Sequence, residues 1–373
     1  MKKLAVAATA LALIATTLTA APANAAATPA HQAKYGLECA KLKDVAVKKG
    51  ADGSNLVCKV ETAGTYSGKK IWAYPTFPTI KDMDLYMAGG AGGGYDTFGR
   101  ELMRSMKAEG TLINDATFRN ISGAGGTTGL SAFLVNEKGK SGKGLVTGFA
   151  MVGGVASTKV PFDTSDAVAT ARMMGEWEAV VVAADSPYKT LADLVADIKA
   201  NPKLAIAGGS KGTVDHVFMG LLVEKAGGKA TAMNYVPYAG GGEVTTSVLS
   251  GQTVAGVSGT SEFASFVKAG KLRVLALSSP KRLKSIKGQT LTAQGINFVF
   301  GNWRGVLAPA SLTEAERINW LKVVDVTRAG DAWKATLVAQ DWQNQTDYGK
   351  DFAAFLDSQK KDVTATLVSL GLA

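Results

Sequence analysis

The sequence predicts a mixed α/β fold of two lobes with a small N-terminal appendage. Short apolar runs alternate with helix-like patterns along most of the 373 residues, as in a sheet flanked by helices. The chain is also longer than one hydrophobic core usually serves, which favours two lobes. We assign residues 81–176 and 297–373 to the first lobe and residues 177–296 to the second.

Residues 1–25 have the pattern of a secretory signal peptide. Lys2 and Lys3 precede an apolar run from residue 4 to residue 18, and Ala23-Asn24-Ala25 resembles a cleavage site. We therefore expect cleavage near Ala25 and export to the periplasm, the cell envelope or the exterior. The glutamate before Cys39 does not fit a lipid-attachment signal, so we expect no lipid anchor.

Residues 26–80 are predicted to form an N-terminal extension and linker. Cys39 and Cys58 are the two cysteines of the chain, and in an exported protein one disulfide between them is the economical arrangement. Such a staple contributes roughly 3 kcal/mol. Residues 26 to about 70 hold few large apolar side chains, so we expect no core there. Two prolines within residues 72–78 indicate an extended bridge to the main body.

The elements of the main body alternate between strand and helix. In the first lobe we expect strands at residues 85–88, 117–121 and 144–152, and helices at residues 97–107 and 128–136. In the second lobe we expect a buried strand at residues 179–183 and later strands through Ile206, Val236, Val254 and residues 274–277. Helices opened by capping boxes are expected at Thr190 with Asp193 and at Thr313 with Glu316, and an amphipathic helix at residues 352–370.

Three glycine-rich turns lie between a predicted strand and a predicted helix, at residues 89–96, 123–128 and 208–213. Glycine lets the backbone approach a ligand closely, and consecutive N–H groups at the positive end of a helix attract an anion. A single turn of this kind is more simply a tight helix cap. Three in one chain favour a shared anion site.

Other sites are disfavoured. The third glycine of the dinucleotide-binding pattern is replaced by Tyr95 in the first turn and by Thr128 in the second, and no P-loop sequence occurs. Two histidines and two cysteines are too few for the usual zinc patterns, so we expect neither a metal nor a cofactor. The net charge of +10 comes from scattered lysines and arginines, which indicates a solvated basic surface and no nucleic-acid partner.

The third turn leaves an enzymatic alternative open. Residues 208–212 match the G-x-S-x-G elbow of serine hydrolases, with Ser210 as the nucleophile. A hydrolase needs a histidine that is positioned independently of that serine. His216 follows in the same predicted helix, and His31 lies in the N-terminal tail. We therefore expect no catalytic residue, and a secreted serine hydrolase is kept as an alternative.

Seven segments in order carry a family resemblance: AGGAGGGYDTFGR (88–100), ISGAGGTTG (121–129), DSPYKTLADLV (185–195), GGSKGTVDH (208–216), VPYAGGGE (236–243), AGKLRVLALSSPKRL (269–283) and FGNWRGVLAP (300–309). With these segments, the chain from about residue 81 resembles the solute-binding proteins of tripartite tricarboxylate transporters, the TctC or Bug family. The cysteine segment lies outside the family pattern, and Ala91 stands where a proline often begins the glycine run.

The resemblance implies a type II periplasmic-binding-protein fold, a Venus flytrap whose lobes close on a carboxylate. The implied ligand-binding residues are Gly92, Gly93, Gly94, Tyr95, Asp96, Gly125, Gly126, Thr127, Ser210, Thr213, Tyr238, Ser258 and Arg304. Asp96 is more typical of a helix cap than of a ligand for an amine. Arg304 either pairs with a second ligand carboxylate or forms a structural salt bridge.

The resulting hypothesis is an exported, monomeric binding protein for a small carboxylate, which it hands to a membrane permease. The resemblance favours a citrate-like di- or tricarboxylate. A binding protein for another organic acid or an amino acid that docks to a signalling receptor is an alternative, and the sequence does not separate it from the permease partner.

Overall fold

The computed structural model describes residues 27–372, so the predicted signal peptide lies outside the described residues. The helices are α1 (Gly94–Ala108), α2 (Thr127–Asn136), α3 (Phe149–Thr158), α4 (Leu191–Ala200), α5 (Val214–Lys225), α6 (Gly241–Leu249), α7 (Thr260–Lys268), α8 (Glu314–Ala329), α9 (Asp331–Ala339) and α10 (Gly349–Ser369). The strands of the main body are β4 (Met83–Met87), β5 (Ala116–Asn120), β6 (Lys143–Gly148), β7 (Val168–Ala183), β8 (Ala205–Gly208), β9 (Asn234–Pro237), β10 (Ala255–Gly259), β11 (Leu272–Leu277), β12 (Gly301–Ala308) and β13 (Gln343–Tyr348).

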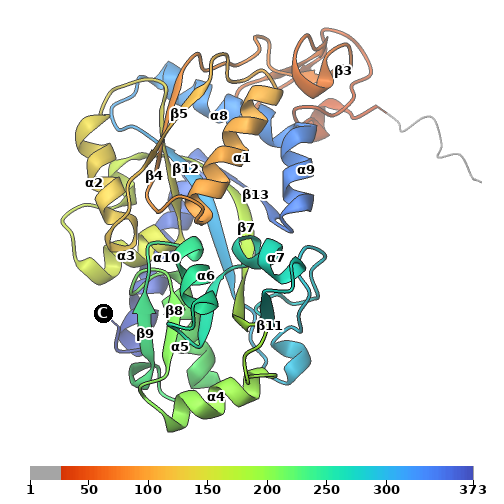
Figure 1. The fold of residues 1–373 in the computed structure, drawn as a ribbon. Helices are drawn as coiled ribbons and strands as arrows, with labels where there is room; N and C mark the ends of the chain where they lie inside the picture. Colours follow the sequence, from red (N-terminus) through yellow and green to blue (C-terminus); the bar gives the residue numbers. More distant parts are fainter. Residues whose placement is uncertain (1–26, 373) are drawn as a thin grey trace, which may run out of the picture.

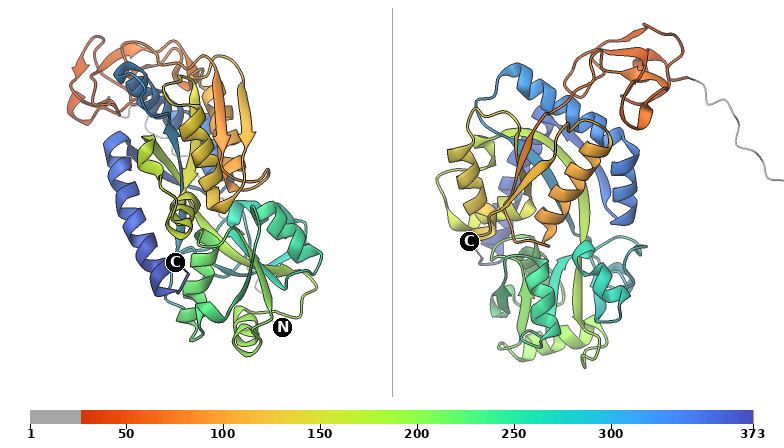
Figure 2. Two further views of the ribbon diagram at one scale, coloured as in Figure 1. Left: turned by 90° about the vertical axis from the view of Figure 1, so that its left-hand side faces the viewer. Right: turned by 45° about the horizontal axis from the view of Figure 1, so that its top comes forward.

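Two α/β lobes lie one above the other (Figure 1). The upper lobe contains β4, β5, β6, β12 and β13, and the lower lobe contains β8 to β11. One sheet runs through both lobes in the order β5-β4-β6-β12-β7-β10-β8-β9, and β11 and β13 also pair with β7. The helix α10 begins beside the upper lobe and ends beside the lower one (Figure 2, left).

The strand β7 connects the lobes. Residues 168–177 pair with β12, and residues 178–181 pair with β10. The sequence predicted only residues 179–183 of this strand, because its earlier part mixes Arg172, Glu176 and Glu178 with apolar residues. Glu176 and Glu178 are buried where the strand passes from one lobe to the other.

Each lobe has its own apolar core. In the upper lobe, α1 buries Phe98, Leu102 and Met106 against the sheet, on the face that the helical spacing predicts. In the lower lobe, the core includes Val180, Phe218 and Val257.

The strand predicted at residues 144–152 is too long. β6 ends at Gly148 and α3 begins at Phe149. Residues 149–152 belong to a largely buried helix, and a short apolar run does not distinguish a buried helix from a strand.

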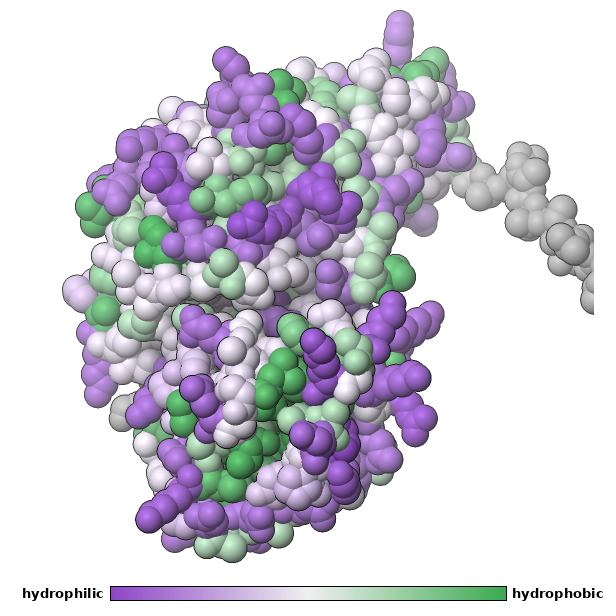
Figure 3. All heavy atoms as spheres, viewed as in Figure 1, coloured by the Kyte–Doolittle hydropathy of each residue, from purple (hydrophilic) through white to green (hydrophobic). Residues whose placement is uncertain are grey.

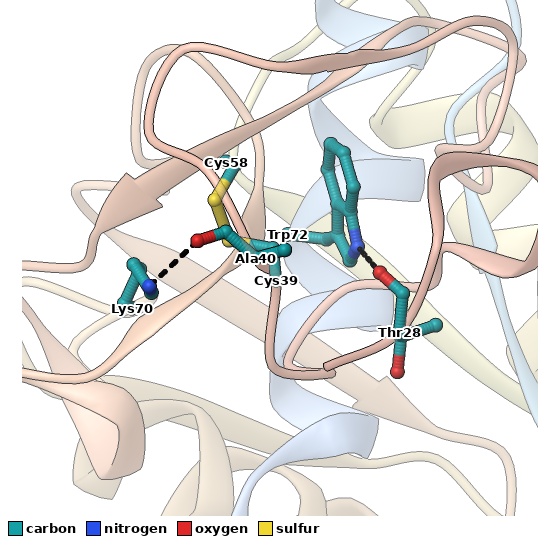
Figure 4. The surroundings of a disulfide bond; sticks show 6 residues. All are labelled: Thr28, Cys39, Ala40, Cys58, Lys70 and Trp72. Atoms are coloured by element: carbon teal, nitrogen blue, oxygen red, sulfur yellow. Dashed lines mark hydrogen bonds between the residues drawn. A yellow bond between two sulfur atoms is a disulfide. The ribbon is translucent and has the colours of Figure 1, made fainter. Parts of the chain in front are cut away.

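The N-terminal appendage is a folded unit. It contains β1 (Val45–Ala46), β2 (Leu56–Val60) and β3 (Lys70–Ala73), which form a three-stranded sheet. The predicted disulfide between Cys39 and Cys58 is present, with the two Cα atoms 5.7 Å apart. Beside it, the indole nitrogen of Trp72 donates to the Thr28 carbonyl at 2.8 Å (Figure 4).

The expectation that this segment has no core is wrong. Tyr35, Leu56, Trp72 and Tyr74 are buried together against residues of α8. Trp72 therefore belongs to β3 and to this core, and not to an extended bridge. A few aromatic side chains, which are large, supply the apolar area that the composition seemed to lack.

No helix within residues 27–372 has both the length and the apolar character to cross a bilayer.

Candidate ligand-binding site

A cavity between the lobes brings the three glycine-rich turns together. It has a volume of about 650 Å³, including the solvent at its mouth. Gly93 and Gly94 come from the first turn, Gly125 and Gly126 from the second, and Ser210 from the third. In the space-filling view a band of pale residues, neither strongly hydrophilic nor strongly hydrophobic, crosses the face where the lobes meet (Figure 3).

Several helices begin at this cavity. Gly94 is the first residue of α1, Val214 of α5 and Gly241 of α6, and all three line the cavity. The first N–H groups of a helix have no partner within the helix, and they carry the positive end of its dipole. The cavity wall therefore attracts negative oxygens through the backbone.

The second turn favours glycine at three of its positions. Gly123, Gly125 and Gly126 all have positive φ angles, of 136°, 67° and 99°, which side chains strongly disfavour. A Cβ atom at Gly125 would also lie 2.7 Å from the Cα of Gly154 in α3. The backbone of the turn thus packs closely against α3 on one side and lines the cavity on the other.

Two aspartates close the first and third turns in the same way. The carboxylate of Asp96 accepts a hydrogen bond from the Gly92 N–H at 2.9 Å, and that of Asp215 accepts one from the Gly209 N–H at 2.7 Å. The N-cap of α1 is Gly93, so Asp96 lies inside the first turn of the helix. The expectation that Asp96 precedes the helix as its cap is therefore corrected.

The cavity includes nine of the thirteen predicted ligand-binding residues: Gly93, Gly94, Tyr95, Gly125, Gly126, Ser210, Thr213, Ser258 and Arg304. Gly92, Asp96, Thr127 and Tyr238 do not line it. The Thr127 hydroxyl donates to the Ala124 carbonyl at 3.0 Å, and the Tyr238 hydroxyl lies 2.7 Å from that of Ser247. These two side chains hold the turns and do not face the cavity.

Tyr95 supports the wall of the cavity. Its phenol oxygen accepts a hydrogen bond from the Met151 N–H at 2.9 Å. This contact fixes the first turn against α3.

Sequence reasoning missed two acidic residues that line the cavity, Asp215 and Glu262. The position of Asp215, just after a glycine turn as with Asp96, was a usable clue. Glu262 gave none, since it stands in the first turn of α7 like many surface glutamates. Burial raises the pKa of Glu262 to about 7 and that of Asp215 to about 6.

Arg304 already has a partner within the protein. It forms a buried salt bridge with Glu176, and its Nη2 lies 3.9 Å from the Glu262 carboxylate. Of the two roles expected from the sequence, the structure contains the salt bridge.

The geometry does not fit a serine hydrolase. The Nδ1 atom of His216 accepts a hydrogen bond from the Gly212 N–H at 3.0 Å, and its ring stacks on Tyr235 with centroids 4.1 Å apart. Burial, with Lys211 nearby, lowers the pKa of His216 to about 4. His216 therefore braces the third turn.

Across residues 27–372, no group of three or more His, Cys, Asp or Glu side chains is arranged to hold a metal ion.

Solved structures share this fold. MatC from Rhodopseudomonas palustris, with bound malate, is 17% identical and superposes with a TM-score of 0.66 over 79% of this chain and 100% of that one. Rpa4515 from R. palustris, with adipate, is 16% identical, with a TM-score of 0.67 over 80% of this chain and 99% of that one. The two-lobed binding-protein fold is confirmed.

Sequence relatives give the family. The UPF0065 protein in the gbd 5' region of Cupriavidus necator is 30% identical over 201 residues, which are 52% of this chain and only 59% of that protein. The model of the tripartite tricarboxylate transporter family receptor, TctC, matches residues 107–368, more than half of the chain. The chain therefore belongs to the TctC family of solute-binding receptors.

Proposed function

We propose that this protein captures a small carboxylate between its lobes and delivers it to a membrane permease of the tripartite tricarboxylate type. The observation that carries the proposal is the convergence of glycine turns and helix N-termini from both lobes on one cavity. Such a wall binds carboxylate oxygens without side-chain charge. Malate in MatC and adipate in Rpa4515 support the same ligand class.

The energetics explain why both lobes take part. A hydrogen bond to a charged group contributes about 1.5–3 kcal/mol, whereas micromolar affinity requires about 8 kcal/mol. Association itself costs about 4 kcal/mol or more. One turn does not supply this sum, so the ligand needs donors from both lobes, and the closed form is favoured because it alone provides them.

The proposal also covers the two lobes that move against each other, the oligomeric state and the ligand. Residues 81–176 with 297–373 move against residues 177–296, and β7 pairs with strands of both lobes. The protein acts as a monomer after removal of residues 1–25. The sequence resemblance favours a citrate-like di- or tricarboxylate.

A thermal-shift screen of the purified protein tests the proposal. We expect small carboxylic acids such as malate, succinate, adipate or citrate to raise the melting temperature, whereas neutral sugars and amides of the same acids leave it unchanged. A ligand at about 100 times its Kd stabilises by about 2.7 kcal/mol. Stabilisation by neutral solutes alone would rule out carboxylate binding.

Replacement of Ser210 by alanine separates binding from hydrolysis. Ser210 lines the cavity, so we expect Ser210→Ala to weaken carboxylate binding several-fold by calorimetry. The wild-type protein should show no ester hydrolysis. Turnover that disappears in Ser210→Ala would instead establish the hydrolase.

A further inference from the structure

The cavity contains more negative charge than a receptor for plain carboxylates needs. Asp215 and Glu262 line it, and Glu176 and Glu178 are buried next to it. Arg304 is the one cation among the lining residues, which all belong to the described chain. If all five groups are ionised, four carboxylates face one guanidinium. Burial together with the neighbouring carboxylates makes this state costly and raises the pKa of Glu262, Asp215 and Glu178, so these groups are not all ionised together near neutral pH without a ligand.

Arg304 has little capacity left for a second ligand carboxylate. Its side chain is only 5% exposed and is paired with Glu176. Its Nε atom is buried and has no hydrogen-bond partner within residues 27–372. Both oxygens of Glu178 are also buried and without such a partner. These buried groups without partners add to the cost of keeping the network charged.

Glu262 lies where the lobes meet. A Cβ atom added at Gly94, in the upper lobe, would be 2.7 Å from one oxygen of Glu262. At Gly241, at the start of α6, it would be 1.6 Å from the other. An acceptor therefore stands directly beside the helix N-termini that donate to a carboxylate. Donors and an acceptor side by side match a molecule that carries a carboxylate and an ammonium group close together.

We propose that the ligand is an aminocarboxylate, whose carboxylate binds the glycine turns and whose ammonium nitrogen binds Glu262 with help from Asp215. This inference rests on the proposed function, narrows the small carboxylate to one that carries an ammonium group, and departs from the citrate-like acid that the sequence resemblance favours. An ammonium group has three donors and one positive charge, and an ionised carboxylate only accepts. The ligand ammonium thus compensates the charge of Glu262 when that carboxylate is ionised.

Binding of an aminocarboxylate should depend on pH. Burial raises the pKa of Glu262 to about 7 against the opposing effect of Arg304. Glu176 and Glu178 on β7, Asp215 on α5 and Arg304 on β12 are the charged groups around it. An ammonium ligand needs Glu262 ionised, so its affinity should increase as the pH rises through about 7. A diacid without nitrogen should bind less tightly over the same range.

Matched ligand pairs provide the test. Calorimetry on the purified protein compares aspartate with succinate, glutamate with glutarate, and alanine with propionate, so that each pair differs by the ammonium group. At about pH 8 we expect at least one aminocarboxylate to bind about tenfold or more tighter than its counterpart, a difference of about 1.4 kcal/mol. Glu262→Gln should bring this ratio close to one. The control Glu224→Gln, at an exposed position of α5, should keep it.

The outcomes separate this inference from the proposed function. If the diacids bind as tightly as their amino counterparts, or if Glu262→Gln shifts both members of a pair equally, the ammonium site is wrong and carboxylate binding stands. If no carboxylate binds, both proposals fail. The pH profile of the wild-type protein is an independent test, because affinity for the aminocarboxylate that falls from about pH 5.5 to about pH 8 overturns the inference.

Discussion

Glu262 should destabilise the protein without ligand above neutral pH. Its pKa is raised by burial to about 7, from about 4.3 in an unfolded chain. The free energy of unfolding therefore includes the full contribution of the protonated Glu262 at pH values below the pKa of the unfolded chain. This contribution is lost as the pH rises through the folded-state pKa of about 7. We expect Glu262→Gln, which stays neutral, to melt at a higher temperature than wild type at about pH 8, and at a similar temperature near pH 4.

The melting temperatures are measured by calorimetry without ligand, with Glu224→Gln as the exposed control. A lower melting temperature of Glu262→Gln at about pH 8 would mean that the ionised carboxylate stabilises the fold through Arg304.

The glycine turns were predictable from the sequence, whereas Glu262 was not. Gly92, Gly125 and Gly212 have positive φ angles. Glycine is the residue that adopts such angles most readily, so this local requirement is visible in the sequence. Glu262 and Arg304 approach each other only because α7 and β12 meet in the folded protein. No local pattern encodes such a meeting, so sequence reasoning located the cavity wall and Arg304 and missed the acidic side chains beside that arginine.

The disulfide should stabilise the appendage without affecting the ligand site. Cys39 and Cys58 are 19 residues apart and staple the three-stranded sheet that packs on α8. Replacing both by serine should destabilise residues 27–78 by about 3 kcal/mol. Hydrogen exchange should report faster exchange in β2 and β3, while calorimetry gives an unchanged ligand affinity. A loss of affinity would show that the appendage acts on the cavity.

The strand β7 is longer than the apolar run that predicted it. Its apolar end, residues 179–183, lies in the core of the lower lobe and was predicted. The preceding residues 168–178 cross to the upper lobe and contain Glu176 and Glu178. Buried charge in a strand departs from the apolar pattern of a core strand, and here it coincides with the ligand site. The part of the strand that the sequence did not predict is therefore the part nearest to the candidate ligand site.

The two lobes touch each other at glycine residues in this structure. Gly93 of the first turn and Gly240 before α6 are neighbours, and a Cβ at Gly240 would be 3.4 Å from the Cα of Gly93, an ordinary contact distance. A Cβ at Gly153 of α3 would lie 2.3 Å from the carbonyl oxygen of Gly212 in the third turn. Contact between the lobes at α3 therefore depends on glycine at position 153.

Gly153→Ala should keep the lobes apart without harming either of them. The three atoms nearest to the added Cβ, at 2.3 to 3.3 Å, all belong to Gly212 and Thr213, and alanine in a helix is more favourable than glycine by about 1 kcal/mol. We expect an unchanged or higher melting temperature without ligand, carboxylate affinity reduced about tenfold or more, and no ligand-induced compaction in small-angle scattering. Gly242→Ala is the matched control, because its Cβ would lie 3.7 Å from the Ala91 carbonyl oxygen, at ordinary contact distance. If Gly153→Ala binds and compacts like Gly242→Ala, closure does not require this contact.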